Sequence, residues 1–150
     1  MKKTYVHYGT DVYDPEITRR LVLSERAFER FDKPAGLWAS PEDSDCCWKN
    51  WCEWEQFETE RLKKSFRFVL RDGTRVLKLN SLKDAEGVLT RFSDDCPLPM
   101  KRLNLRKLYE EYDAVEAVIG GTDLRNETVF MGWDVDSICV WNPDAVKPLQ

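Results

Sequence analysis

Short segments in which apolar and polar residues alternate run through the chain and predict β-strands. The first, Thr4–Thr10, is rich in aromatic and β-branched residues and reaches a turn at Gly9. Alternation places Tyr5 and His7 on one face of this strand and Val6 on the other. Further strands are expected in the segments GLWAS (36–40), DAVEAVI (113–119), ETVFMGW (127–133) and DSICVWN (136–142).

The residues around Asp72 and Gly73 carry the clearest local signal. Phe66, Phe68 and Leu70 alternate with their neighbours before this dipeptide, and a second apolar run follows it. Asp-Gly between two such runs is typical of a tight turn. A β-hairpin is therefore predicted here.

Four segments carry apolar residues at the three- to four-residue spacing of an amphipathic helix. They are a short helix around Ser24–Phe31, a helix capped by Ser44 or Asp45, a helix capped by Asn80 or Ser81, and the segment 103–112. In the second helix Trp48 and Trp51 are expected to face the core, with acidic residues in the first turn. Two prolines predict a loop in the segment 93–101.

The expected strands outnumber the helices, and they occur both in hairpins and across helices. This order predicts an α+β fold rather than a doubly wound parallel sheet. We expect mostly antiparallel strands in a split or two-sheet core with a few flanking helices. The length of 150 residues is typical of one domain and allows burial of roughly 68–70% of the unfolded chain's surface, so residues 1–150 are interpreted as a single domain.

The charge balance narrows the classes of partner. The chain has 23 basic and 27 acidic residues and a formal net charge of -4, so neither nucleic acid nor an anionic membrane is an expected partner. The two lysines near the start are not followed by an apolar run, and the chain contains no apolar stretch long enough to span a bilayer. These features favour a cytoplasmic protein.

The cysteine and histidine content argues against a disulfide framework and a metal site. Five cysteines are an odd number, no C-x-x-C pair occurs, and His7 is the single histidine. Structural zinc sites draw their ligands mainly from Cys and His at characteristic spacings, which are missing here. No metal is therefore expected.

Three features remain as candidates for chemistry, because the usual nucleotide-binding and hydrolase motifs do not occur. His7 lies on the first expected strand, and Trp38 follows a glycine on a second one. Asp134 and Asp136 precede the apolar part of the last strand, where alternation would place both carboxylates on the face of Ile138. Carboxylates on an apolar face are costly unless they are exposed or used.

The order of these elements resembles the ADP-ribosyltransferase fold of the diphtheria-toxin and poly-ADP-ribose polymerase type. The resemblance rests on VHYGT (6–10), GLWAS (36–40) with the downstream CCWKNW (46–51), and DSICVWNPDAV (136–146). The chain also resembles a group of bacterial and phage proteins that share the patterns KP-x-GLWASP, YDA and GWD-x-DSI followed by NPD, where x is any residue. The family resemblance implies NAD as substrate and either transfer of ADP-ribose to an acceptor or hydrolysis of NAD.

The resemblance also implies roles for individual residues. His7 takes the place of the histidine that binds the ribose on the nicotinamide side, and Trp38 that of the tyrosine that stacks on nicotinamide. Asp136, or alternatively Asp134, stands for the catalytic glutamate, although counting back from the Asn-Pro pair places that glutamate nearer Ser137. The neighbouring Tyr8, Gly9 and Ser40 complete the implied NAD-binding set.

Chemical logic supports this set, since cleavage of the nicotinamide–ribose bond develops positive charge on the sugar, which a carboxylate stabilises. An aromatic ring offers a flat face to the cationic pyridinium. A second hypothesis is a non-enzymatic, phage-encoded interaction protein that acts in the host cytoplasm. It would bind a host protein through exposed tryptophans such as Trp51 or Trp54.

Overall fold

The computed structural model describes residues 2–24, 33–94 and 102–150 and has an α+β fold. Seven strands form one sheet in the order β4-β7-β8-β2-β1-β3-β9. All neighbouring pairs in this sheet are antiparallel except β4 with β7. The strands are β1 (Thr4–Tyr8), β2 (Leu37–Pro41), β3 (Ser65–Leu70), β4 (Val76–Leu79), β7 (Ala114–Ala117), β8 (Ser137–Val140) and β9 (Val146–Pro148), and β5 (Ser93–Asp94) and β6 (Arg102–Leu103) form a separate ribbon.

The helices in the described ranges flank this sheet. They are α1 (Pro15–Leu23), α2 (Trp48–Glu55), α3 (Leu82–Phe92) and α4 (Leu105–Glu111), with short 3-10 turns η2 (Thr59–Lys63), η3 (Leu124–Asn126), η4 (Thr128–Phe130) and η5 (Pro143–Ala145). Ser81 caps α3 as predicted, by accepting a hydrogen bond from the Asp84 amide. A further helix is predicted around Ser24–Phe31. Except for Ser24, its residues lie outside the described ranges. Sequence reasoning missed α1, although Asp14 as N-cap and Pro15 at the first helical position are its signal.

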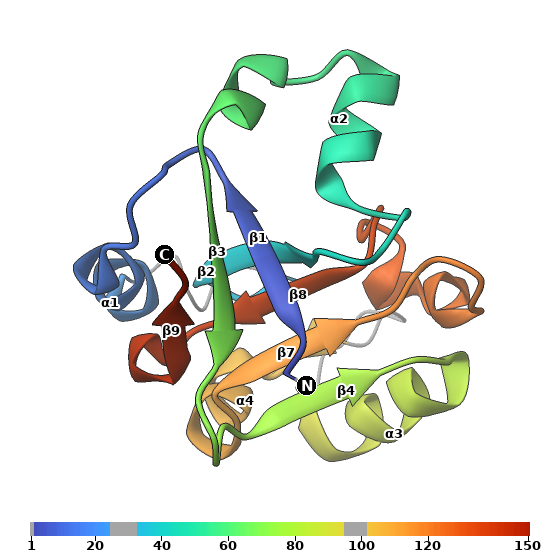
Figure 1. Cartoon of the computed structure of the whole chain (residues 1–150). Helices are drawn as coiled ribbons and strands as arrows, with labels where there is room; N and C mark the ends of the chain where they lie inside the picture. The colour runs from blue at the N-terminus through green and yellow to red at the C-terminus, as the bar shows by residue number, and fades with distance from the viewer. Residues whose placement is uncertain (1, 25–32, 95–101) are drawn as a thin grey trace.

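The sheet is split into two halves that pack face to face, as the sequence predicts. In Figure 1, β1 and β3 run across β7 and β8 and lie in front of them. One apolar cluster joins the two halves, because Tyr5 and Phe68 of the first half pack with Ile138 and Val140 of the second. The core between the halves is therefore made mainly by strands, with Ala145 of η5 added to it.

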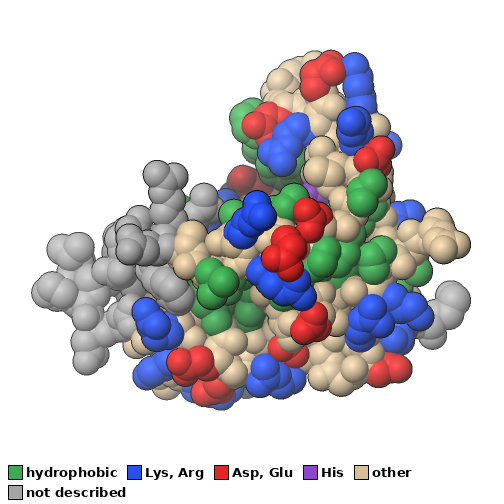
Figure 2. All heavy atoms as spheres, turned by 90° about the vertical axis from the view of Figure 1, so that its left-hand side faces the viewer, with side chains coloured by type: hydrophobic (Ala, Val, Ile, Leu, Met, Phe, Trp, Pro, Cys, Tyr) green, Lys and Arg blue, Asp and Glu red, His purple; other side chains and the backbone are tan. Residues whose placement is uncertain are grey.

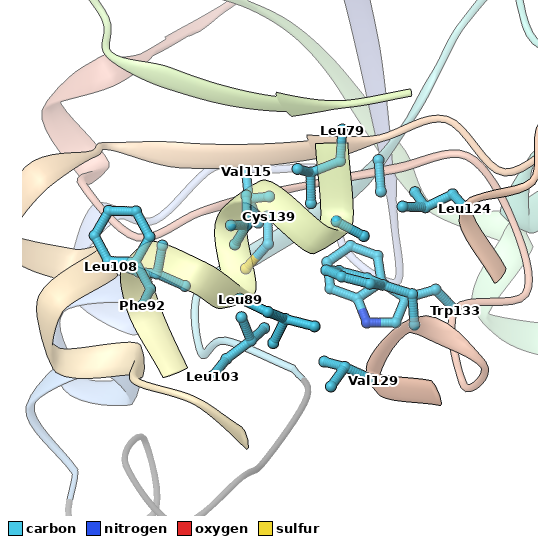
Figure 3. Close-up of a cluster of buried hydrophobic side chains, with 14 of the residues drawn as sticks. Leu79, Leu89, Phe92, Leu103, Leu108, Val115, Leu124, Val129, Trp133 and Cys139 are labelled. Atoms are coloured by element: carbon cyan, nitrogen blue, oxygen red, sulfur yellow. The ribbon is translucent and has the colours of Figure 1, made fainter. Parts of the chain in front are cut away.

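A second core lies on the other face of the β4-β7-β8 half, under α3 and α4. Leu89 and Phe92 of α3 and Leu108 of α4 pack there against Val115 and Cys139 of the strands (Figure 3). Trp133, which follows η4, closes this core at one end. The predicted helix after Asn80 or Ser81 and the predicted helix in 103–112 are confirmed as α3 and α4.

The predicted hairpin around Asp72 and Gly73 is wrong, although the chain does turn there. β3 pairs with β1 and β9, whereas β4 pairs with β7 in the other half of the sheet. Buried Asp113 accepts hydrogen bonds from the Arg75 backbone amide at 2.8 Å and from its guanidinium at 3.1 Å. This contact draws the chain toward β7, so the strands diverge after the turn.

The predicted strand at 127–133 is also wrong. The segment forms η4 and buries Val129, Phe130 and Trp133 but not Met131, which is 59% exposed. Phe130 and Trp133 meet edge to face at 5.5 Å between ring centroids. Their spacing suits a single helical turn better than the alternation of a strand. Alternation predicts Asp134 and Asp136 on the Ile138 face of the last strand. They lie before it instead, because β8 begins at Ser137.

A buried carboxylate links the two halves of the sheet. Glu116 on β7 accepts a 2.7 Å hydrogen bond from the Tyr5 hydroxyl of β1 and pairs with Lys3 at 3.0 Å. Burial, together with this hydrogen bond to Glu116, raises the pKa of Tyr5, so its hydroxyl remains a donor at neutral pH. The contact fixes the position of β1 over β7.

Candidate functional site

A pocket of about 450 Å³ opens beside the end of β1 and the start of β2. The strands form one wall of the pocket. The opposite wall is formed by residues 48–63, which comprise α2 and η2 and are called the arm below. The arm stands above the sheet in Figures 1 and 2. The loop before β8 closes the third side. The pocket is lined by Val6, His7, Tyr8, Lys33, Gly36, Trp38, Ala39, Ser40, Trp48, Glu58, Arg61, Gly132, Trp133, Asp134, Val135 and Ser137.

The pocket exists because β1 and β2 part from each other. Their register is limited to Tyr5 opposite Pro41 and Val6 opposite Ser40, although the sequence of both strands continues. Beyond this point the His7 side chain connects the two strands by a hydrogen bond, with Nδ1 lying 2.6 Å from the Trp38 carbonyl oxygen. A side chain thus replaces the missing backbone contact, and the space between the two strand ends becomes the pocket.

His7 is held neutral by its surroundings. Burial lowers the pKa of its imidazole, against the opposing effect of the Trp38 carbonyl, and nearby Arg61 lowers it further. Since a carbonyl oxygen only accepts hydrogen bonds, the Nδ1 atom carries the proton. The Nε2 atom is therefore the acceptor of this imidazole.

The indole of Trp38 is fixed by contacts with Pro34 and Trp133. Its indole Nε1 donates to the Pro34 carbonyl at 3.2 Å, and its ring meets Trp133 edge to face at 5.0 Å. Gly36 allows this arrangement, because a Cβ atom there would collide with the Val140 carbonyl of β8. The half-buried indole lines the pocket with its position set by these three neighbours.

The arm is attached to the pocket through Ser40. The Ser40 hydroxyl accepts a 2.9 Å hydrogen bond from the Trp48 amide at the start of α2. Neither Ser44 nor Asp45 caps this helix, and its first turn holds no acidic residue, so both predictions are wrong. The chain passes Ser44 before the helix begins, and the cap is supplied from β2.

The tryptophans of the arm pack mainly on each other. Trp48 and Trp51 stack with centroids 5.1 Å apart, and Phe57 meets both rings edge to face. Both tryptophans are only half-buried, whereas Cys52 behind them is fully buried. The two tryptophans therefore form a small aromatic cluster with Phe57 instead of facing the main core as the sequence predicts. Trp48 also lines the pocket.

Four charged side chains line the pocket, and sequence reasoning identified just one of them, Asp134. Glu58 and Arg61 from the arm pair at 3.2 Å, and Asp134 lies 3.9 Å from Arg125. Lys33 lines the same pocket. The i,i+3 spacing of Glu58 and Arg61 could have predicted their pairing, but not the fold of the arm that carries them to the pocket.

Asp136, the preferred candidate for the catalytic acid, does not line the pocket. Its Oδ1 atom accepts hydrogen bonds from the amides of Ile119 and Gly120 at 2.7 and 2.8 Å, and its Oδ2 atom accepts one from the Ser44 hydroxyl at 2.7 Å. Its own amide donates to the Cys46 carbonyl. With 8% of its surface exposed, Asp136 fastens three loops together.

The structure brings together most of the other predicted site residues. His7, Tyr8, Trp38, Ser40, Asp134 and Ser137 line one pocket. Ser137 donates its hydroxyl to the Val135 carbonyl at 2.9 Å. Gly9 lies beside the pocket beneath the guanidinium of Arg61, where a Cβ atom would come within 3.1 Å of Nη2.

Comparisons with models of protein families, with curated proteins and with solved structures found no match. The site is thus interpreted from its own geometry. In the described ranges, no group of three or more Cys, His, Asp or Glu side chains could hold a metal ion. No helix of those ranges has the length and apolar character needed to cross a membrane.

Replacement of Asp136 tests whether its carboxylate is structural. Asp136→Ala leaves two loop amides without acceptors and should lower the free energy of unfolding by about 2–4 kcal/mol in urea denaturation. Asp136→Asn retains one oxygen acceptor and should lose clearly less. Equal stability of Asp136→Ala and the wild type would show that these hydrogen bonds do not hold the loops.

Proposed function

We propose that this protein binds NAD in the pocket and cleaves the bond between nicotinamide and ribose. The ADP-ribose would pass to an acceptor, as in an ADP-ribosyltransferase, or to water, as in an NAD glycohydrolase. The proposal extends the resemblance of the sequence to that family, and one observation carries it. His7 and Trp38, which are 31 residues apart, line the same pocket and are joined by a 2.6 Å hydrogen bond.

Trp38 would supply the flat face for the nicotinamide ring. A cation over an indole is attracted by roughly 0.5–2 kcal/mol, depending on how far water is excluded. Because the indole is fixed by Pro34 and Trp133, stacking requires little further ordering of this side chain. The pocket volume falls within the range of about 300–1,000 Å³ that is typical of ligand sites.

His7 would bind the ribose next to nicotinamide. Its Nδ1–H is already used by the Trp38 carbonyl, so Nε2 remains to accept a hydrogen bond from a ribose hydroxyl. The lowered pKa keeps this nitrogen available at neutral pH. The same hydrogen bond couples the ribose-binding group to the strand that carries the stacking indole.

Asp134 takes the catalytic role in this proposal in place of Asp136. Asp134 lines the pocket and is partly exposed, whereas both carboxylate oxygens of Asp136 are occupied by loop hydrogen bonds. In the transition state the electron pair of the breaking C–N bond moves to the nicotinamide ring nitrogen, and positive charge develops on the ribose. A carboxylate beside the ribose lowers the energy of this state more than that of the ground state.

Release of nicotinamide from NAD by the purified protein tests this proposal. The wild type should release nicotinamide and Asp134→Asn should lose at least about 100-fold in kcat, as expected when a charge-stabilising group is removed. Asp11→Asn changes an exposed acid away from the pocket and serves as the matched control. Absence of nicotinamide release with and without a cell lysate as acceptor source would refute the proposal.

A second candidate function, binding of a host protein, is favoured by the outer face of the arm. Trp54 is 87% exposed and Phe57 is 45% exposed, which is unusual for residues of this size. Tryptophan is a frequent anchor of protein interfaces. This function needs no ligand in the pocket.

A pull-down with paired variants separates the two candidate functions. If the arm is a binding face, Trp54→Ala should lose a specific partner that His7→Ala retains. Trp54 does not line the pocket, so the same change should leave nicotinamide release within about twofold of the wild type if the protein is an enzyme. A partner retained by Trp54→Ala would contradict the arm as the binding face.

A further inference from the structure

Two cationic side chains that line the pocket, Lys33 and Arg61, are given no ligand contact by the mechanism above. We propose that Arg61, with Lys33, forms an anion site for a phosphate group of the ligand, and that Glu58 occupies Arg61 when the ligand is absent. The inference rests on the proposed function in taking this anion to be the pyrophosphate of NAD. Glu58 would then act as a built-in competitor of the ligand.

Arg61 is held at the pocket by its fit to β1. The guanidinium lies over Gly9, where a Cβ atom would be 3.1 Å from Nη2 and 3.2 Å from Nε. The Gly9 amide donates to the Lys64 carbonyl at 2.9 Å, which anchors the end of the arm to the same strand. A Cβ atom at position 9 would thus require the guanidinium to shift by a few tenths of an ångström.

Within the described ranges, the ion pair of Arg61 is made with Glu58 alone, through Nη1. Both partners are exposed to a large extent, at 56% and 42% of their side-chain surface. Exposed pairs of this kind contribute little to stability. A phosphate offers more negative charge and more acceptor oxygens than one carboxylate, and it matches the planar guanidinium in a bidentate way. An incoming phosphate can therefore displace Glu58.

The backbone of Glu58 has an uncommon conformation. Glu58 has a φ of 46°, in the left-handed region that non-glycine residues seldom adopt. Unfavourable backbone conformations of this kind gather at ligand sites. Gln56, two residues earlier, has a φ of 54° but does not line the pocket, so it provides a matched control.

Calorimetric titration with inorganic pyrophosphate and with ADP-ribose tests the anion site. Arg61→Gln should weaken binding of both probes at least tenfold, because it removes the guanidinium. Glu58→Gln should tighten binding at least threefold, because it removes the competing carboxylate. Gln56→Gly, which changes the other left-handed residue and keeps both charges, should bind within twofold of the wild type.

Three results would overturn the anion site: no pyrophosphate binding by the wild type at millimolar concentration, unchanged binding by Arg61→Gln, or weaker binding by Glu58→Gln. If Arg61→Gln does not fold, Glu58→Gln alone decides the outcome. Arg61-dependent pyrophosphate binding without NAD cleavage would retain the anion site and refute the NAD proposal. NAD cleavage by Arg61→Gln with a wild-type KM would support the NAD proposal and refute the anion site.

Discussion

The arrangement of the whole site depends on how the split sheet is joined. β1 and β2 connect the two halves, and their register covers just two residue pairs before the strands part. The hydrogen bond from the His7 imidazole to the Trp38 carbonyl spans the gap that follows. Elsewhere the halves are held by the shared apolar cluster and by the contact of Tyr5 with Glu116. A pocket between strand ends is therefore a direct consequence of splitting this sheet.

This construction explains why chemistry would be located at that joint. Strand ends hold His7 and Trp38 rigidly, whereas the arm brings Glu58 and Arg61 over them from a separate part of the chain. The arm is tied to the strands at both ends, through Ser40 at α2 and through Gly9 after η2. Groups suited to a flat ring, a sugar hydroxyl and an anion thus face one cavity.

Sequence patterns predicted the α+β class and the split sheet. The family resemblance implied that His7, Trp38 and Asp136 share one site, and the structure places His7 and Trp38 at the pocket but not Asp136. They failed where long-range contacts override local signals. The Asp-Gly turn does not make a hairpin, because Asp113 draws Arg75 toward β7. The alternation of apolar and polar residues likewise cannot reveal that the Asp136 carboxylate accepts hydrogen bonds from loop amides. Nor can it reveal that Glu58 in the arm has a left-handed backbone conformation.

The most direct test of this account is long-range proton–nitrogen NMR of the imidazole, which reports on His7 alone because the chain has a single histidine. We expect a neutral ring at pH 7 with its proton on Nδ1, because burial lowers its pKa and the Trp38 carbonyl accepts from that atom. Addition of NAD should then shift the Nε2 resonance. A protonated ring, a proton on Nε2, or resonances unaffected by saturating NAD would contradict the account.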